Sequence, residues 1–235
     1  MIDIHNHSLY GVDDGAKSLE ESIEMLRAAR KQGIDTIILT PHYRYGMFPY
    51  QKEVIEEHFE QLKKATNGLD INLYLGCEYH VNSEMVDAFR MGRCEPLAGG
   101  DFVLTEYSYE TEYSYIVQNT RLLLARGYIP VIAHVERYLC FFCAPKCCKE
   151  IQQLGAMIQI NADSILGLNG GKVERFCRKI LKKQWVDIVA SDAHGINKRK
   201  NHLRESMEYV NKRYGMEYTQ KLFLTNPEKI IAHIK

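Results

Sequence analysis

Seven short apolar runs alternate with helix-like segments along the chain, and this alternation restricts the fold more than any other feature. The runs cover residues 2–4, 36–40, 71–76, 101–105, 128–133, 156–160 and 186–190. Repeated strand–helix units build a parallel sheet, and seven units in 235 residues favour a barrel, with an open doubly wound sheet as the alternative. We therefore predict an α/β fold, a distorted seven-stranded (β/α) TIM-like barrel that forms a single domain over residues 1–235.

The helical segments between the runs have recognisable ends. Ser18 is a predicted N-cap with Glu21 three residues later, as in a capping box, and the helix that follows is predicted to end at Gly33. Further helices are predicted over about 51–65, 83–91, 113–125, 145–154 and 172–183, and the tail from 199 to 235 is predicted to be mostly helical.

Composition disfavours several classes of protein. The formal net charge is zero, so no general basic field is present to bind nucleic acid. No apolar run approaches the roughly 20 residues of a membrane-spanning helix. Asp3, His5 and His7 interrupt the N-terminal apolar segment, so we expect no signal peptide and a cytoplasmic location.

Seven cysteines are predicted to be reduced thiols, because their number is odd and no export signal is recognised. Four of them cluster in CFFCAPKCC, at Cys140, Cys143, Cys147 and Cys148. Their spacing matches neither a paired zinc motif nor a familiar iron–sulfur motif. We interpret this segment as a loop and the start of a helix.

Side chains that bind metal ions follow six of the seven apolar runs. His5 and His7 share one face of the first predicted strand, because alternate side chains of a strand point the same way. Barrel active sites lie at the carboxyl ends of the strands, so the whole set is expected to converge on one rim. The candidate ligands are His5, His7, Asp14, His42, Glu78, Glu106, His134, Asp192 and His194. Nine ligands exceed the needs of one ion and suit a site with two or three divalent ions.

Arginines beside these ligands point to an anionic substrate. Arg137 lies in AHVERY, Arg199 follows SDAH, and Arg44 comes just after His42 as a weaker candidate. A guanidinium group binds phosphoryl oxygens with two parallel hydrogen bonds. Metal ions together with arginines therefore predict a phosphoryl substrate, because a multi-metal site activates water and stabilises phosphoryl oxygens during in-line attack.

Seven motifs occur in order at the predicted strand ends: DIHNH, DDG, TPHY, GCEYH, AHVERY, QINADSILG and SDAH. Together they resemble the polymerase-and-histidinol-phosphatase (PHP) superfamily, and more closely the metal-dependent tyrosine-protein phosphatases of bacterial capsule and exopolysaccharide operons. The resemblance implies the distorted PHP barrel and three divalent ions, usually manganese. The mixture of imidazole and carboxylate ligands also suits iron or zinc, and magnesium is a further alternative. It also implies hydrolysis of phosphotyrosine on a partner tyrosine kinase that governs polysaccharide export.

The resemblance further implies how the ligands and arginines divide the work. The ions are expected at His5, His7, Glu78 and Asp192 for the first, at Glu78, Glu106 and His134 for the second, and at Asp14, His42 and His194 for the third. A metal-bridging hydroxide would attack phosphorus, with His42 among the catalytic residues. Arg137 and Arg199 would bind the phosphoryl oxygens, with Arg44 as an additional contact.

Two positions depart from the family pattern. Val135 stands where the family commonly has the proline of AHPER, and Lys200–Asn201 follow Arg199 in place of two prolines. Proline restricts the backbone more than these residues do, so the loop that carries Arg199 is expected to sit differently.

Two other functions stay open on the sequence alone. One is hydrolysis of histidinol phosphate or another small phosphomonoester, and the other is a non-catalytic metal-binding regulatory module. A cysteine-based tyrosine phosphatase is disfavoured, because it needs arginine six residues after its nucleophile and none of the seven cysteines has one there.

Overall fold

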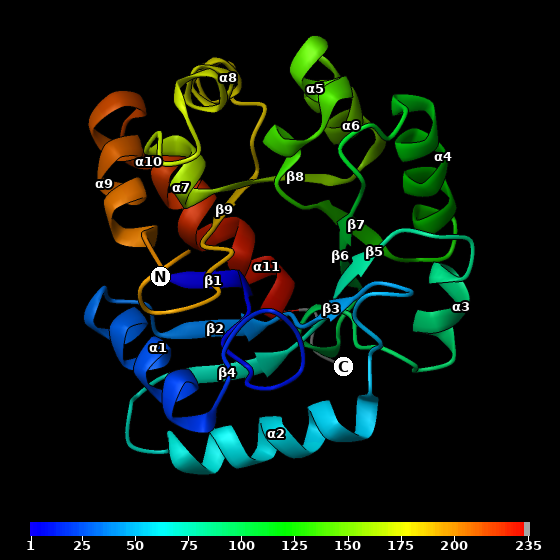
Figure 1. The fold of residues 1–235 in the computed structure, drawn as a ribbon. Helices are drawn as coiled ribbons and strands as arrows, with labels where there is room; N and C mark the ends of the chain where they lie inside the picture. Colours follow the sequence, from blue (N-terminus) through cyan, green and yellow to red (C-terminus); the bar gives the residue numbers. More distant parts are fainter. Residues whose placement is uncertain (233–235) are drawn as a thin grey trace.

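Parallel strands occupy the centre of the structure, and helices surround them (Figure 1). This computed structural model describes residues 1–232. The strands in these residues are β1 (Ile2–Asn6), β2 (Thr36–Leu39), β3 (His42–Tyr43), β4 (Asn72–Leu75), β5 (Glu78–His80), β6 (Phe102–Glu106), β7 (Ile129–Ile132), β8 (Met157–Asn161) and β9 (Ile188–Ala190). An α/β fold with a parallel sheet is therefore confirmed, but the strand count differs from the predicted seven.

The helices lie between and outside the strands, and two of them, Leu139–Cys143 and Ala162–Ile165, were not predicted. They are α1 (Leu19–Lys31), α2 (Lys52–Ala65), α3 (Met85–Arg90), α4 (Tyr113–Leu124), α5 (Leu139–Cys143), α6 (Cys147–Leu154), α7 (Ala162–Ile165), α8 (Gly171–Lys182), α9 (Leu203–Tyr214), α10 (Met216–Gln220) and α11 (Asn226–Ala232). Three tighter or wider turns are η1 (Leu97–Gly99), η2 (Val135–Arg137) and the π-helical η3 (Lys221–Thr225). Residues 233–235 of the predicted helical tail lie outside the described residues.

Each of the seven predicted runs contains a strand, but the chain breaks the ladder after the second and the third. Pro41 separates β2 from β3, because proline has no N–H for the ladder. Gly76 and Cys77 separate β4 from β5. The two breaks lie side by side, since the Glu78 N–H donates to the Pro41 carbonyl at 3.2 Å. Just past the second and third runs, pairing resumes in the short strands β3 and β5, and these two additional strands raise the number from seven to nine among the described residues.

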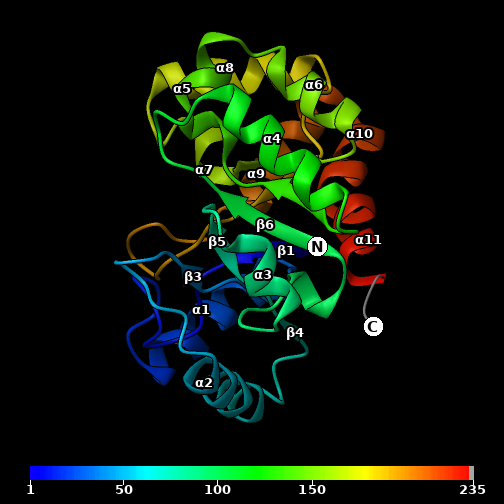
Figure 2. The ribbon, with the colours of Figure 1, turned by 90° about the vertical axis from the view of Figure 1, so that its right-hand side faces the viewer.

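The strands follow one another around a ring. One sheet has the order β1-β2-β4 and the other the order β3-β5-β6-β7-β8-β9, with parallel pairing throughout. β9 meets β1 through a parallel bridge between Asn6 and Ala193, and the Asp192 N–H donates to the His5 carbonyl at 2.9 Å. Loops that follow β1, β3 and β9 lie on one side of the strands, at the left of Figure 2, and α11 lies on the other side.

Apolar side chains pack on both faces of the ring. Ile4, Ile38 and Leu104 belong to one buried cluster, which Ile230 of α11 completes. A larger cluster joins the outer faces of the strands to the helices, and Leu39 and Leu26 are fully buried members. Polar side chains at the carboxyl ends of the strands are thus held by apolar packing beneath and around them.

Local signals explain most element boundaries, with one correction. Ser18 caps α1 by accepting a hydrogen bond from the Glu21 N–H, as predicted. The segment CFFCAPKCC is not a simple loop, because its first half forms α5 before α6 begins at Cys147. All seven cysteines are free thiols. Within residues 1–232, no helix has both the length and the apolar character needed to cross a bilayer.

Asp3 provides a test of how the ring is joined. Its carboxylate is fully buried and accepts hydrogen bonds from the Ser191 N–H and hydroxyl and from the Asn6 amide. We expect Asp3→Ala to lower the free energy of unfolding by about 3 kcal/mol in urea denaturation, because each orphaned buried donor costs about 1–3 kcal/mol. Asp70→Ala, which removes an exposed partner of Arg30, should cost under about 1 kcal/mol. Equal losses in the two variants would contradict a role for Asp3 in joining β1 to β9.

Candidate metal centre

The nine candidate ligands lie together at the carboxyl ends of the strands. They come from separate elements: His5 from β1, His42 from β3, Glu78 from β5, Glu106 from β6, His134 from the turn after β7, Asp192 and His194 from the loop after β9, and His7 and Asp14 from the loop after β1. Three overlapping groups of these side chains have ligand atoms within 4.8 Å of one another. Residues up to 189 positions apart in the sequence therefore form one connected cluster.

The first group contains His5, His7, Glu78 and Asp192, the same set that was predicted for one ion. The Nε2 atoms of His5 and His7 lie 3.1 and 3.2 Å from Oε2 of Glu78. They lie 3.4 and 3.6 Å from Oδ1 of Asp192. All four side chains are buried, so water can satisfy few of their polar atoms.

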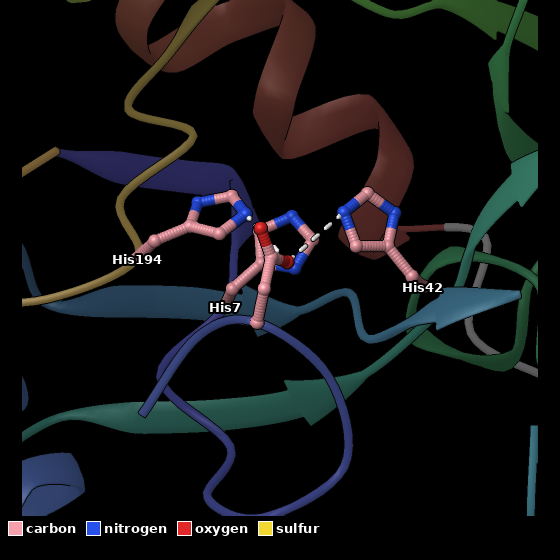
Figure 3. Close-up of side chains that lie close together, drawn as sticks. His7, His42 and His194 are labelled. Carbon is pink, nitrogen blue, oxygen red and sulfur yellow. Dashed lines mark ion pairs between the residues drawn. The ribbon is translucent and has the colours of Figure 1, made fainter. Parts of the chain in front are cut away.

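The second group contains Asp14, His42 and His194, as predicted, and adds His7 to them. Figure 3 shows the imidazoles of His7, His42 and His194 facing one another. Oδ1 of Asp14 lies 3.3 Å from Nε2 of His194 and 3.5 Å from Nε2 of His42. The His7 and His194 rings stack with their centroids 3.9 Å apart. His7 thus stands between the first and second groups.

The third group contains His42, Glu78 and Glu106, so it has His42 where His134 was predicted. Nδ1 of His42 lies 3.1 Å from Oε2 of Glu78. His134 stays beside both carboxylates, with its Nε2 atom 2.8 Å from Glu78 and 3.8 Å from Glu106. Glu78 therefore lies beside both His42 and His134, and its carboxylate connects the first group with the third.

The chemistry of these donors fits metal coordination. The Nδ1 atom of His7 faces Asp13 at 2.8 Å, and the Nδ1 atom of His194 faces the Asp192 carbonyl at 2.9 Å. These partners can only accept, so Nδ1 carries the proton and Nε2 presents its lone pair to the cluster. Four buried atoms in the cluster make no hydrogen bond of acceptable geometry, even where an ion-pair partner lies within 3.3 Å: Nδ1 of His42, Oε2 of Glu78, Oε2 of Glu106 and Nε2 of His194. Divalent ions would satisfy these atoms.

The electrostatics of the cluster favour positive charge. Burial opposes protonation of His5, but the carboxylates of Glu78 and Asp192 outweigh it and raise the His5 pKa to about 9. Burial and the neighbouring Glu78 carboxylate raise the pKa of Glu106 to about 7. Both shifts have the same origin, which is negative charge enclosed in a region with little water. A cation among these side chains would offset the repulsion between the Glu78 and Glu106 carboxylates.

Two of the three predicted arginines reach the cluster. Arg137 donates to Oδ2 of Asp192 at 2.7 Å. Arg199 donates to Asp192 at 3.2 Å and to Oδ2 of Asp14 at 3.3 Å. Both side chains stay 41% exposed, so each guanidinium keeps donors free for a ligand. Arg44 forms no ion pair among residues 1–232. The pKa of His80 is lowered mainly by burial, and the positive charge of Arg44 lowers it further.

Two residues fix the loop that carries Arg199, where the sequence departs from the family. The Asn201 amide donates to the buried Asp3 carboxylate at 3.1 Å, and its Oδ1 accepts the Leu203 N–H at the start of α9. The His194 N–H donates to the Arg199 carbonyl at 2.9 Å. These hydrogen bonds hold the loop in place without the two prolines. Arg199 points toward the candidate ligands, as predicted.

Sequence reasoning missed three residues that hold the ligands in place. Oε1 of Gln159 accepts the His134 N–H at 2.9 Å and faces Nδ1 of His5 at 3.2 Å. Asn161 donates to Oδ2 of Asp192 at 2.7 Å, and Gln159 donates to Asn161 at 2.9 Å. These amides alternate along β8, which corresponds to the one predicted run that no candidate ligand follows, and that alternation was the available signal. Asp13, beside the predicted Asp14, holds His7 as described above.

Backbone conformation helps to aim the ligands. His134, Asp192 and Arg199 have φ values of +32°, +52° and +48°, which lie in the left-handed region. Side chains other than glycine seldom adopt this conformation, and such residues gather where a site requires it. Gly15 has a related role, because a Cβ atom there would lie 2.1 Å from the His7 carbonyl. The loop between His7 and Asp14 can close this tightly only with glycine.

Comparison with known proteins agrees with this geometry. Residues 1–232 match the family model described as capsular polysaccharide synthesis, CpsB/CapC. The chain is 32% identical over 238 residues to the tyrosine-protein phosphatase CpsB of Streptococcus pneumoniae, and the match covers 98% of each protein. It is 34% identical over 219 residues to the tyrosine-protein phosphatase YwqE of Bacillus subtilis, covering 92% of this chain and 86% of that protein.

Solved structures give the same relationship. The fold matches, with a TM-score of 0.93 and 32% identity, a crystal structure from work on YwqE of Bacillus subtilis and CpsB of Streptococcus pneumoniae, described as metal-dependent tyrosine phosphatases. That match covers 100% of this chain and 96% of the other. An organophosphorus hydrolase from Deinococcus radiodurans shares only the fold, with a TM-score of 0.63 and 14% identity. The predicted resemblance is confirmed, and the chain belongs to the CpsB/CapC family of capsular polysaccharide synthesis.

Proposed function

We propose that this chain is a metal-dependent protein-tyrosine phosphatase. The observation that carries the proposal is the cluster of eight histidine and carboxylate side chains in the three groups, with His134 beside Glu78 and Glu106 as the ninth and two arginines at its edge. Relatives that match 98% of the chain are named tyrosine-protein phosphatases, which supports phosphotyrosine as the substrate. The family description supports a role in capsular polysaccharide synthesis. The proposed physiological substrate is a tyrosine kinase that regulates capsule or exopolysaccharide synthesis.

Three divalent ions, manganese first, are the proposed cofactors. The first set of ligands is His5, His7, Glu78 and Asp192, the second is Glu78 and Glu106 with His134 or His42, and the third is Asp14, His42 and His194 with His7 beside them. When bound, such ions supply Lewis acidity, which activates water and neutralises phosphoryl charge. Mixed imidazole and carboxylate ligands suit manganese, iron or zinc, and magnesium to a lesser degree.

The protein's own side chains orient the substrate. Arg137 and Arg199 approach Asp192 from separate elements and keep donors free, so together they can bind the oxygens of one phosphoryl group. Phe48 stacks on His42 with ring centroids 5.0 Å apart, which places an aromatic surface where the tyrosine ring would pack. The phenolate leaving group has a pKa of roughly 10, so the reaction needs little help from a general acid.

Removal of divalent ions should abolish the activity. We expect a chelator to lower hydrolysis of a tyrosine-phosphorylated peptide at least about 100-fold, and manganese to restore it, because charge stabilisation in the transition state is lost. His42→Ala should lose a similar factor with metal present. His58→Ala on α2 should keep its activity, since His58 is not a candidate ligand and hydrogen-bonds to the Tyr10 carbonyl and stacks on the Tyr10 ring. A phosphoserine peptide and histidinol phosphate complete the panel. Preference for histidinol phosphate would overturn the substrate assignment, and activity indifferent to chelator would overturn the metal mechanism.

Arg137 should act on the phosphoryl group. Arg137→Ala should lower kcat/KM for the phosphotyrosine peptide by about 100-fold or more, because a donor to the developing charge is removed. Arg137→Lys should recover only part of the loss, since lysine keeps the charge but not the paired donors. Arg121→Ala, at an exposed position of α4, is the matched control. If Arg137→Ala changes kcat/KM no more than this control, the proposed contact is wrong.

Gln159 should determine metal affinity without binding metal itself. Gln159→Ala removes the acceptor that orients His5 and should weaken metal binding by about 10–100-fold in a competition titration with a chromophoric chelator. Gln118→Ala, an exposed residue of α4, should leave the affinity unchanged. An unaltered affinity in Gln159→Ala would show that the ligands keep their orientation without the β8 amides.

A further inference from the structure

A groove lined by positive charge lies between α5 and α8, outside the metal centre. Its volume is about 270 Å³, and it is lined by Phe142, Pro145, Lys172, Arg175, Phe176 and Lys179. The rings of Phe142 and Phe176 stack at its base, with centroids 5.2 Å apart and an angle of 15° between their planes. The groove thus has an aromatic base and cationic walls.

The positive charge of the groove is a local feature, because the formal net charge of the whole chain is zero. Residues 171–183 carry six cations and one acid, Glu174. That acid pairs with Arg178, which also donates to the Tyr209 hydroxyl and is not among the residues that line the groove. Lys172, Arg175 and Lys179 are exposed and form no ion pair among residues 1–232. Their spacing of three and four residues puts them on one helix face, where like charges repel and an anion would stabilise them.

The form of the groove favours a peptide over a lipid surface. Its aromatic base can hold one side chain, while the lysine and arginine side chains can pair with carboxylates. The apolar residues of α8 face inward, since Phe176, Ile180 and Leu181 are buried. The helix therefore offers no exposed apolar side chain for insertion between lipids.

The groove is close to the metal centre along the chain and in space. η2 carries Arg137, α5 begins two residues later at Leu139, and α8 packs against η2. Figure 1 shows α5 and α8 at the same end of the molecule. Phe142 comes five residues after Arg137, so their Cα atoms are at most about 17 Å apart. An extended peptide covers that distance with about five residues.

We propose that this groove binds an acidic segment of the tyrosine-phosphorylated protein, about five to eight residues from the phosphotyrosine. The proposal rests on the proposed function for the identity of the partner. Phosphotyrosine would lie at the metal centre beside Arg137, and the chain would cross α5 to place carboxylates against Lys172, Arg175 and Lys179. The groove would then contribute to the choice of substrate and not to the chemical step.

The test compares two phosphotyrosine peptides that differ only in their extension, one with glutamates and one with glutamines. A variant with Lys172→Glu, Arg175→Glu and Lys179→Glu should raise KM for the acidic peptide about tenfold, the size expected when three exposed ion pairs are lost. Its kcat/KM for the glutamine peptide and for p-nitrophenyl phosphate should not change. With the unmodified protein, added salt should reduce the difference in KM between the acidic peptide and the glutamine peptide, because salt screens exposed ion pairs.

The control makes the same change of net charge elsewhere, with Lys31→Glu, Lys64→Glu and Lys212→Glu, all exposed. A neutral variant with Lys172→Gln, Arg175→Gln and Lys179→Gln is used if the first variant folds poorly. Equal KM values for the two peptides, or an equal loss in the control, would overturn the proposal.

Binding of the unphosphorylated acidic peptide, followed by fluorescence anisotropy, separates this proposal from the phosphatase assignment. Binding that is lost only in the groove variant supports the groove even if no phosphoester is hydrolysed. Binding of anionic vesicles, with no binding of the acidic peptide, would identify a membrane surface instead and overturn the proposal.

Discussion

The enclosed carboxylate of Glu78 is the interaction on which the rest of the site depends. It lies within 3.2 Å of His5, His7, His42 and His134, and it has no exposed surface. A buried carboxylate without compensating positive charge is costly, so the surrounding imidazoles must be held at close range. The ring of parallel strands does this, because the carboxyl ends of β1, β3 and β5 meet there and the apolar interior below them resists distortion.

A further layer of hydrogen bonds keeps those imidazoles in one orientation. Asp13, Gln159 and the Asp192 carbonyl each bind the ring nitrogen that faces away from the cluster. Asp3 and Asn201 do the same for the backbone that presents Arg199. Asp13 and the Asp192 carbonyl hold His7 and His194 from within the same loop, whereas Gln159 of β8 holds His5 of β1 from a different strand. The breaks at Pro41 and Gly76 also help to place the ligands. His42 comes directly after Pro41, Glu78 comes two residues after Gly76, and both side chains turn toward the centre.

The sequence predicted the strands and the candidate ligands because both leave local signals. An apolar run that ends in histidine or a carboxylate can be recognised residue by residue, and the parallel fold then brings those ends together. The short strands β3 and β5 were not predicted, because each has only two or three residues and forms where parallel pairing resumes just past the breaks. Gln159 and Asn161 were missed, since a buried amide looks ordinary until its partners are known. Phe142 and Phe176 are 34 positions apart in the sequence, so the groove that they line could not be recognised until the structure placed α5 beside α8.

Anomalous diffraction at the manganese edge, from crystals grown with manganese, tests the central claim most directly. The account predicts three peaks within the cluster, each next to one of the ligand groups and two of them beside Glu78. A single well-occupied peak would contradict the three-ion assignment. No peak within the cluster, at manganese concentrations that support phosphatase activity, would contradict the claim that these nine side chains form the metal centre.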